Sequence, residues 1–93
     1  MPYFLLEPPK QFIHPFKGPV IERIVSSAEV ERLCGFRWSV GVSCSWVFKG
    51  ACHIIRPKDG PITDAKAIRR HELAHCNGWP VSHPGGHLVQ VGK

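Results

Sequence analysis

The chain has 93 residues, enough for one small domain with a modest core, so we expect a single domain over residues 1–93. Its 43% of hydrophobic residues is ordinary for a globular protein, and no apolar run approaches the length of a membrane span. The net charge of +5 favours acidic partners only weakly because the basic residues are scattered, so neither a membrane nor a nucleic-acid partner is expected.

Residues 1–19 are rich in proline and carry three phenylalanines. This composition predicts an extended arm that lies over the core rather than a disordered tail. His14 is expected to belong to that packing. The first residues lack the basic region and the long apolar stretch of a signal peptide, so the sequence favours a cytoplasmic location.

Residues 20–35 predict one strand followed by one short helix. The β-branched run at 20–25 favours the strand. Ser26 and Glu29 form a capping-box signature, and Gly35 ends the helix expected over residues 28–34. We expect this helix to support the sheet.

Residues 36–57 have apolar side chains spaced by two on either side of a turn at Lys49-Gly50. This pattern predicts a β-hairpin or a meander. His53 is expected to be an ordinary strand residue, with a place in the cleft as the alternative. The core is expected to contain the large aromatic side chains of this segment, Trp38, Trp46 and Phe48.

The four cysteines include no Cys-x-x-Cys pair, which argues against a four-cysteine zinc site. The favoured pairing is two disulfides, Cys34 with Cys44 and Cys52 with Cys76, the second of which ties a strand to the helix that follows. Four buried thiols are the alternative, which a reducing cytoplasm favours.

Residues 63–77 predict the longest helix of the chain. Thr63 or Asp64 supplies the N-cap, no helix breaker interrupts residues 65–74, and Asn77-Gly78 gives a C-terminal stop. Together with the preceding strands, this helix predicts an α+β domain in which a small, mainly antiparallel sheet packs against the helix.

The predicted helix carries the pattern His71-Glu72-x-x-His75. Histidines four residues apart stand one turn above each other, so both imidazoles can reach one metal ion while Glu72 reaches the open side of that ion. A zinc site needs a third protein ligand, and no Asp or Glu follows Glu72. His83, just past the helix stop, is the expected third ligand, and His87 is the reserve.

This segment resembles the metal-binding helix of the zincin metallopeptidases. The helix-ending Gly78 is similar to that of the metzincin variant, whose pattern is His-Glu-x-x-His-x-x-Gly-x-x-His. Two features depart from that variant: Val81 stands where its third histidine would be, and Met1 is the only methionine, so the methionine turn is missing.

The resemblance implies a metallopeptidase that acts on a peptide or protein substrate. It implies Zn²⁺ held by His71 and His75, to which the spacing adds His83, and Glu72 as the general base for a zinc-bound water that attacks a peptide bond. It also implies an edge strand that holds the substrate, for which residues 47–55 are the candidate segment.

The remaining parts of such a site are less strongly indicated. Backbone carbonyls are the expected partners of the ligand imidazoles, because both aspartates precede the helix. Two rival functions are a non-catalytic zinc-binding interaction domain, whose sign is a closed fourth metal position, and a small basic module that binds no metal. Candidates for stabilising an oxyanion are Tyr3, His87 and Arg70.

Overall fold

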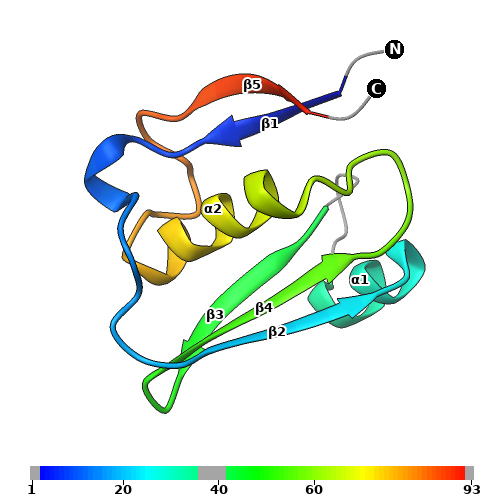
Figure 1. Ribbon diagram of the computed structural model, residues 1–93, viewed down its shortest axis with the longest axis horizontal. Coiled ribbons are helices and arrows are strands. Elements are labelled where there is room, and N and C mark those ends of the chain that lie inside the picture. Colours follow the sequence, from blue (N-terminus) through cyan, green and yellow to red (C-terminus); the bar gives the residue numbers. More distant parts are fainter. Residues whose placement is uncertain (1–2, 36–41, 92–93) are drawn as a thin grey trace.

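The computed structural model describes residues 3–35 and 42–91, and this part of the chain forms the α+β domain that the sequence predicts (Figure 1). No helix in these two ranges is long and apolar enough to cross a membrane. The elements in chain order are β1 (Tyr3–Glu7), the short 3-10 helix η1 (Lys10–Phe12), β2 (Val20–Val25), α1 (Ser27–Cys34), β3 (Cys44–Phe48), β4 (Ala51–Pro57), α2 (Ala65–Cys76) and β5 (His87–Val91).

The strands form two sheets rather than the single sheet expected. One has three strands in the order β2-β4-β3, and the other is a ribbon of β1 and β5. The pairs β3–β4 and β1–β5 are antiparallel, whereas β2 and β4 are parallel. The predicted hairpin is confirmed as β3 and β4. Its turn residues Lys49 (φ 50°) and Gly50 (φ 77°) both have positive φ, as tight hairpin turns require.

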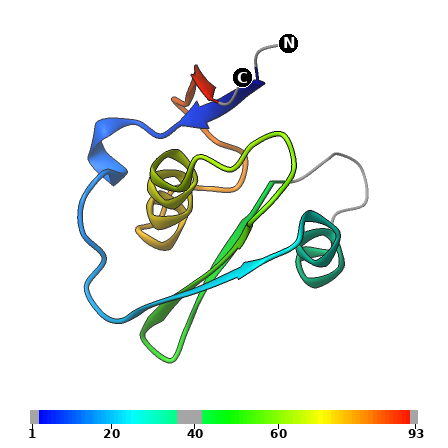
Figure 2. The same ribbon diagram turned by 45° about the vertical axis from the view of Figure 1, so that its right-hand side comes forward.

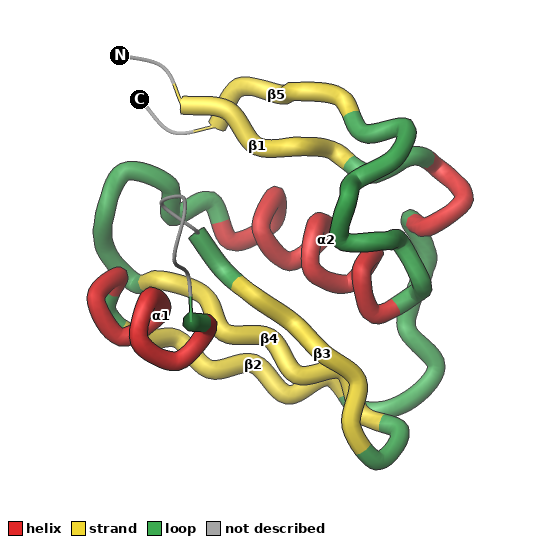
Figure 3. Tube along the Cα trace, turned by 180° about the vertical axis from the view of Figure 1, so that it is seen from behind, coloured by secondary structure: helices red, strands yellow, loops and turns green. Residues whose placement is uncertain are grey.

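Helix α2 lies between the two sheets, with the three-stranded sheet on one side and the β1–β5 ribbon on the other (Figures 1 and 2). Helix α1 covers the opposite face of the three-stranded sheet at one end (Figures 2 and 3). One apolar cluster joins α2 to the ribbon: Ile68 is fully buried and packs with Ala67, Ile62 and Val91. This packing fixes the rotation of α2 about its axis, and so determines where its histidines point.

Helix α1 is capped as its sequence predicts. The side chain of Ser26 accepts a hydrogen bond from the backbone N–H of Glu29, and Gly35 ends the helix in the left-handed conformation (φ 71°). Val30 is its buried residue. The Glu29 carboxylate is held by Arg32, rather than by the backbone N–H of Ser26 that a complete capping box requires.

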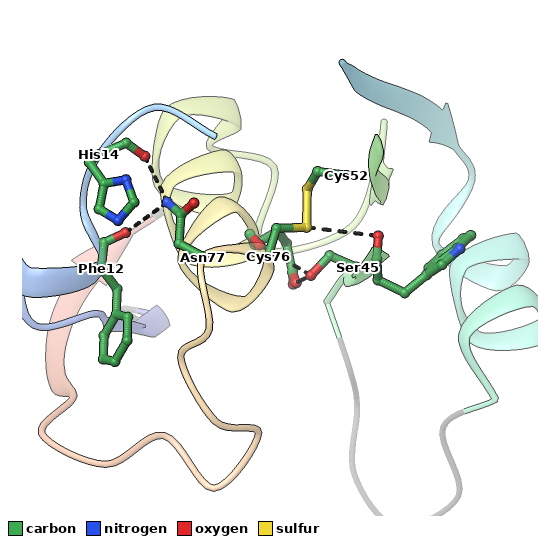
Figure 4. Close-up of a disulfide and its surroundings, with 8 residues drawn as sticks. Phe12, His14, Ser45, Cys52, Cys76 and Asn77 are labelled. Atoms are coloured by element: carbon green, nitrogen blue, oxygen red, sulfur yellow. Dashed lines mark hydrogen bonds between the residues drawn. A yellow bond between two sulfur atoms is a disulfide. The ribbon is translucent and has the colours of Figure 1, made fainter. Parts of the chain in front are cut away.

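Both favoured disulfides are confirmed. Cys34–Cys44 joins the end of α1 to the start of β3, and Cys52–Cys76 joins β4 to the end of α2 (Figure 4). No free cysteine remains in the chain. The two bonds lie on opposite faces of the three-stranded sheet, so each helix is covalently tied to the face that it covers.

The proline-rich arm is not simply an extended segment, because it contains the strand β1 and the 3-10 helix η1. The side-chain N–H group of Asn77 donates hydrogen bonds to the backbone carbonyls of Phe12 (3.2 Å) and His14 (2.7 Å), which fixes the arm to the end of α2 (Figure 4). His14 is exposed, so the expectation that its side chain belongs to the packing of the arm over the core is wrong. Its backbone provides the contact instead.

The core assignment of Trp46 and Phe48 is wrong, because their side chains are 44% and 56% exposed. Both lie on the face of the sheet opposite α2, and α1 covers that face only near Cys44. Trp46 stacks on His53 of the neighbouring strand with ring centroids 5.2 Å apart. His53 is therefore a strand residue of this open face and does not face α2. Trp38 lies outside the described residues.

Candidate metal centre

The helix predicted over residues 63–77 is confirmed as α2, which spans Ala65–Cys76. Of the two candidate caps, Asp64 is the N-cap, because its carboxylate accepts a hydrogen bond from the backbone N–H of Ala67 at 3.1 Å. The helix ends at Cys76 with Asn77 as its C-cap, and Gly78 then adopts a φ of 104° that strongly favours glycine. The chain turns at Gly78 and runs back beside α2, which brings His83 next to His75.

Three histidines converge on one point beside α2. The Nε2 atoms of His71 and His75 are 3.2 Å apart, those of His75 and His83 are 3.1 Å apart, and those of His71 and His83 are 3.3 Å apart. In a tetrahedral zinc site with zinc–nitrogen bonds of about 2.05 Å, neighbouring ligand atoms lie about 3.3 Å apart. The triangle of nitrogen atoms therefore has the dimensions of one face of a zinc coordination sphere.

The outer ring nitrogens of the two helix histidines are held by backbone carbonyls, as expected. Nδ1 of His71 lies 2.7 Å from the carbonyl oxygen of Leu6, and Nδ1 of His75 lies 2.8 Å from that of Trp79. A carbonyl oxygen only accepts, so each Nδ1 carries the proton. This tautomer of the neutral imidazole has its lone pair at Nε2, which is the arrangement that a metal ligand needs.

The third histidine comes from the loop after α2. His83 has a φ of 60°, and this turn is closed by hydrogen bonds from its N–H to the Pro80 carbonyl (2.9 Å) and from the Gly86 N–H to the His83 carbonyl (3.2 Å). Burial, followed by the nearby His71 and His75, lowers the pKa of His83 and favours its neutral form. The reserve candidate His87 is exposed on β5 and takes no part in the cluster.

Trp79 forms an aromatic wall against all three rings, a contact that the sequence analysis did not anticipate. Its indole is 2% exposed, and its ring centroid lies 4.8 Å from that of His75, 4.9 Å from that of His83 and 5.1 Å from that of His71. Its Nε1–H donates to the Pro84 carbonyl at 2.9 Å, which ties the loop carrying His83 to this wall. The sequence feature that could have indicated this contact is the position of Trp79 directly after Gly78, which ends the helix.

Glu72 lies in the same pocket as the three histidines and is 4% exposed. Two serine hydroxyls of the sheet side donate to its carboxylate: that of Ser45 to Oε1 at 2.6 Å, and that of Ser43 to Oε2 at 2.5 Å. The pocket has a volume of about 220 Å³. The sequence analysis missed both serines, whose spacing of two, with Ser45 on β3 and Ser43 directly before it, was the available signal.

The structure does not place the predicted oxyanion and substrate-binding residues that it describes beside the histidine cluster. The Nε of Arg70, a candidate for stabilising the oxyanion, pairs with the Glu7 carboxylate at 2.6 Å, and Arg70 does not line the pocket. The side chain of Tyr3 lies outside the described residues. The proposed substrate segment 47–55 is wrong over most of its length, because Ala51–Pro57 is the central strand β4, which is paired on both sides, and only residues 47 and 48 of the segment belong to an edge strand, β3.

No protein-family model, curated protein or solved structure matches the chain. The likeness to the zincins therefore depends on residues 71–83 and on the geometry of their side chains.

Proposed function

We propose that the chain is a zinc-dependent, metallopeptidase-like hydrolase with His71, His75 and His83 as its metal ligands and Glu72 as its general base. The observation that carries the proposal is the convergence of three Nε2 atoms within 3.3 Å of one another. With the Nδ1 protons of His71 and His75 on carbonyl oxygens, the neutral forms of both rings have acceptors at Nε2. Two facing lone pairs at this distance repel each other unless a cation lies between them.

A bound zinc ion would supply Lewis acidity, which polarises a substrate carbonyl and makes a water molecule acidic near neutral pH. The protein side of the mechanism belongs to Glu72. Its carboxylate accepts the proton of the attacking water and then delivers it to the leaving amine. Ser43 and Ser45 hold this carboxylate in the pocket that the three histidines also line.

A non-catalytic zinc-binding domain is the second candidate, and the hydrogen bonding of Glu72 favours it. Both carboxylate oxygens of Glu72 already accept from serine hydroxyls, as expected for a buried charge with a structural role. Against it, only three histidines converge in the described part of the chain, whereas structural zinc sites use four protein ligands.

The location of the protein also belongs to this proposal. A cytoplasmic location was predicted from the first residues alone. The two disulfides favour an oxidising compartment, because cytoplasmic thiols are normally kept reduced.

Elemental analysis of purified, zinc-reconstituted protein tests the metal site. We expect about one zinc ion per chain in the wild type and in His87→Ala, which is the matched control because His87 is exposed and apart from the cluster. His71→Ala and His83→Ala should lose the metal. Zinc retained by both variants, or absent from the wild type, contradicts the site.

Hydrolysis of a mixture of unstructured peptides, followed by mass spectrometry, then tests the enzyme. Glu72→Gln keeps the shape of the side chain and is expected to keep zinc while losing at least a hundredfold in cleavage rate, because it cannot accept a proton. Zinc-loaded wild type that cleaves no faster than Glu72→Gln supports the non-catalytic domain instead.

A further inference from the structure

A second pocket lies on the side of α2 away from the histidine cluster. Its volume is about 570 Å³, and it lies between the arm and the outer face of α2. With about 100° of rotation per residue, Lys66 and Leu73 share one face of the helix, whereas His71 and His75 point to the other side. This arm–helix groove, lined mainly by Phe12, Ile13, Lys66, Arg69, Arg70 and Leu73, is separate from the metal centre.

The groove combines an apolar surface with three cations. Phe12 and Leu73 are half-buried and Ile13 is 41% exposed, so together they offer an apolar contact surface. The cationic residues Lys66, Arg69 and Arg70 follow one another at helical spacing along the opposite wall. An apolar patch beside a row of positive charges complements a molecule with an apolar body and an anionic end.

The cations keep hydrogen-bonding capacity for such a molecule. Arg69 uses one terminal nitrogen on Glu22, and Arg70 uses its Nε on Glu7, out of the five N–H donors that each guanidinium has. Lys66 is exposed and forms no ion pair within the part of the chain that the structure describes. It is therefore the cation most available to a ligand.

The backbone of the arm disfavours an extended peptide as the occupant. The carbonyls of Phe12 and His14 both accept hydrogen bonds from Asn77, and the N–H groups of Phe12 and Ile13 donate to the Pro9 and Lys10 carbonyls. A peptide that adds to an edge needs free backbone groups of this kind. Recognition in the groove must therefore come from side chains.

We propose that the arm–helix groove binds a compact amphipathic anion, with an apolar body against Phe12, Ile13 and Leu73 and a carboxylate, sulfonate or phosphate against Lys66, Arg69 and Arg70. The volume of about 570 Å³ falls in the range of roughly 300–1,000 Å³ that is typical of small-molecule sites. This binding does not require the metal, because no histidine of the cluster lines the groove.

The test is a fluorescence titration with two matched dyes, performed on metal-depleted protein so that failure of the hydrolase proposal does not affect it. Anilinonaphthalene sulfonate carries an aromatic body and an anion, and N-phenylnaphthylamine carries the same body without the charge. In the wild type we expect saturable binding of the sulfonate. Lys66→Glu should weaken it about tenfold, since the reversal removes one attraction and adds one repulsion, and should change binding of the neutral dye less than twofold.

Two further variants locate the dye. Ile13→Asp should weaken binding of both dyes, and Phe48→Ser, on the open sheet face with its side chain 56% exposed, should weaken neither. A sulfonate signal lost in Phe48→Ser and kept in Lys66→Glu overturns the proposal, as does an equal loss of both dyes in Lys66→Glu. Circular dichroism checks that each variant is folded.

Displacement of the bound sulfonate identifies the class of ligand. Octanoate is expected to displace the dye at lower concentration than octanol, which lacks the charge. An extended acidic peptide that displaces the dye at lower concentration than octanoate contradicts a compact ligand.

Discussion

The backbone carbonyl of Leu6 accepts the Nδ1 proton of His71 at 2.7 Å, across 65 positions of sequence. A residue of β1 therefore determines which ring nitrogen of His71, the first proposed metal ligand, faces the other two histidines. Since the acceptor is a main-chain atom, its position depends on the pairing of β1 with β5 rather than on any side chain. The candidate metal centre is thus supported from both sheets, with Leu6 on one side of α2 and Ser45 on the other.

We predict that Trp79→Phe weakens zinc binding about tenfold while keeping the protein folded. Phenylalanine keeps part of the aromatic wall but loses the hydrogen bond to the Pro84 carbonyl that orders the loop carrying His83. Loss of a group that orients a metal ligand typically costs 10-fold to 100-fold in affinity. Competition with a chromophoric chelator measures the change, and Trp46→Phe, whose indole is 44% exposed, is the control. Equal affinities for the two variants would show that Trp79 does not position the ligands.

We predict that Ser45→Ala lowers the unfolding free energy by about 1–3 kcal/mol, because it removes a hydrogen bond from a buried carboxylate. Ser43→Ala should have a similar effect, since its hydroxyl donates to the other oxygen of Glu72. Urea unfolding of the metal-free protein measures the change. Ser82→Ala, at an exposed loop position, is expected to change the unfolding free energy by less than about 0.5 kcal/mol.

The disulfides are predicted to act differently on the metal site. Replacing both Cys52 and Cys76 by alanine should cost about 3.5 kcal/mol of unfolding free energy, given their sequence separation of 24, and the Cys34/Cys44 pair about 2.8 kcal/mol at a separation of 10. Only the first change should also weaken zinc binding, because Cys76 directly follows the ligand His75. Zinc affinity that falls equally in both double variants would argue against this local coupling.

The metal-free protein is predicted to lose stability as the pH falls below about 6.5. Burial, followed by the proximity of His71 and His75, lowers the pKa of His83 below its ordinary value of 6.5. At a pH between the lowered pKa of His83 in the folded protein and 6.5, the unfolded chain binds a proton at this residue that the folded chain does not. The unfolding free energy therefore decreases as the pH falls through this range. Urea unfolding of the wild type and His83→Gln between pH 7.5 and 5 measures this, and the variant should show a shallower slope.

Local signals in the sequence predicted most of the individual elements. The caps at Ser26 and Asp64, the stops at Gly35 and Gly78 and the turn at Lys49-Gly50 all depend on neighbouring residues, and each is in place. The convergence of His83 with the helix histidines was also predicted, because a short loop after the glycine stop limits how far that residue can lie from the helix.

The features that were missed depend on contacts between distant segments. The β1–β5 pairing joins strands from opposite ends of the described chain, which no local pattern encodes. The exposure of Trp46 and Phe48 follows from the sheet order, which places β3 at an edge and α1 over only part of that face. Ser43 and Ser45 become partners of Glu72 only because β3 lies beside α2.

The pairing of β1 with β5 also has a consequence for the order of folding. Bringing Glu7 beside His87 closes a loop that contains most of the chain, whereas the β3–β4 hairpin closes over two residues. Contacts of such long sequence separation are slow to form, so we expect the hairpin to be established early and the ribbon late. Because the carbonyl that fixes His71 belongs to the ribbon, the capacity to bind zinc should be one of the last properties that the refolding protein acquires.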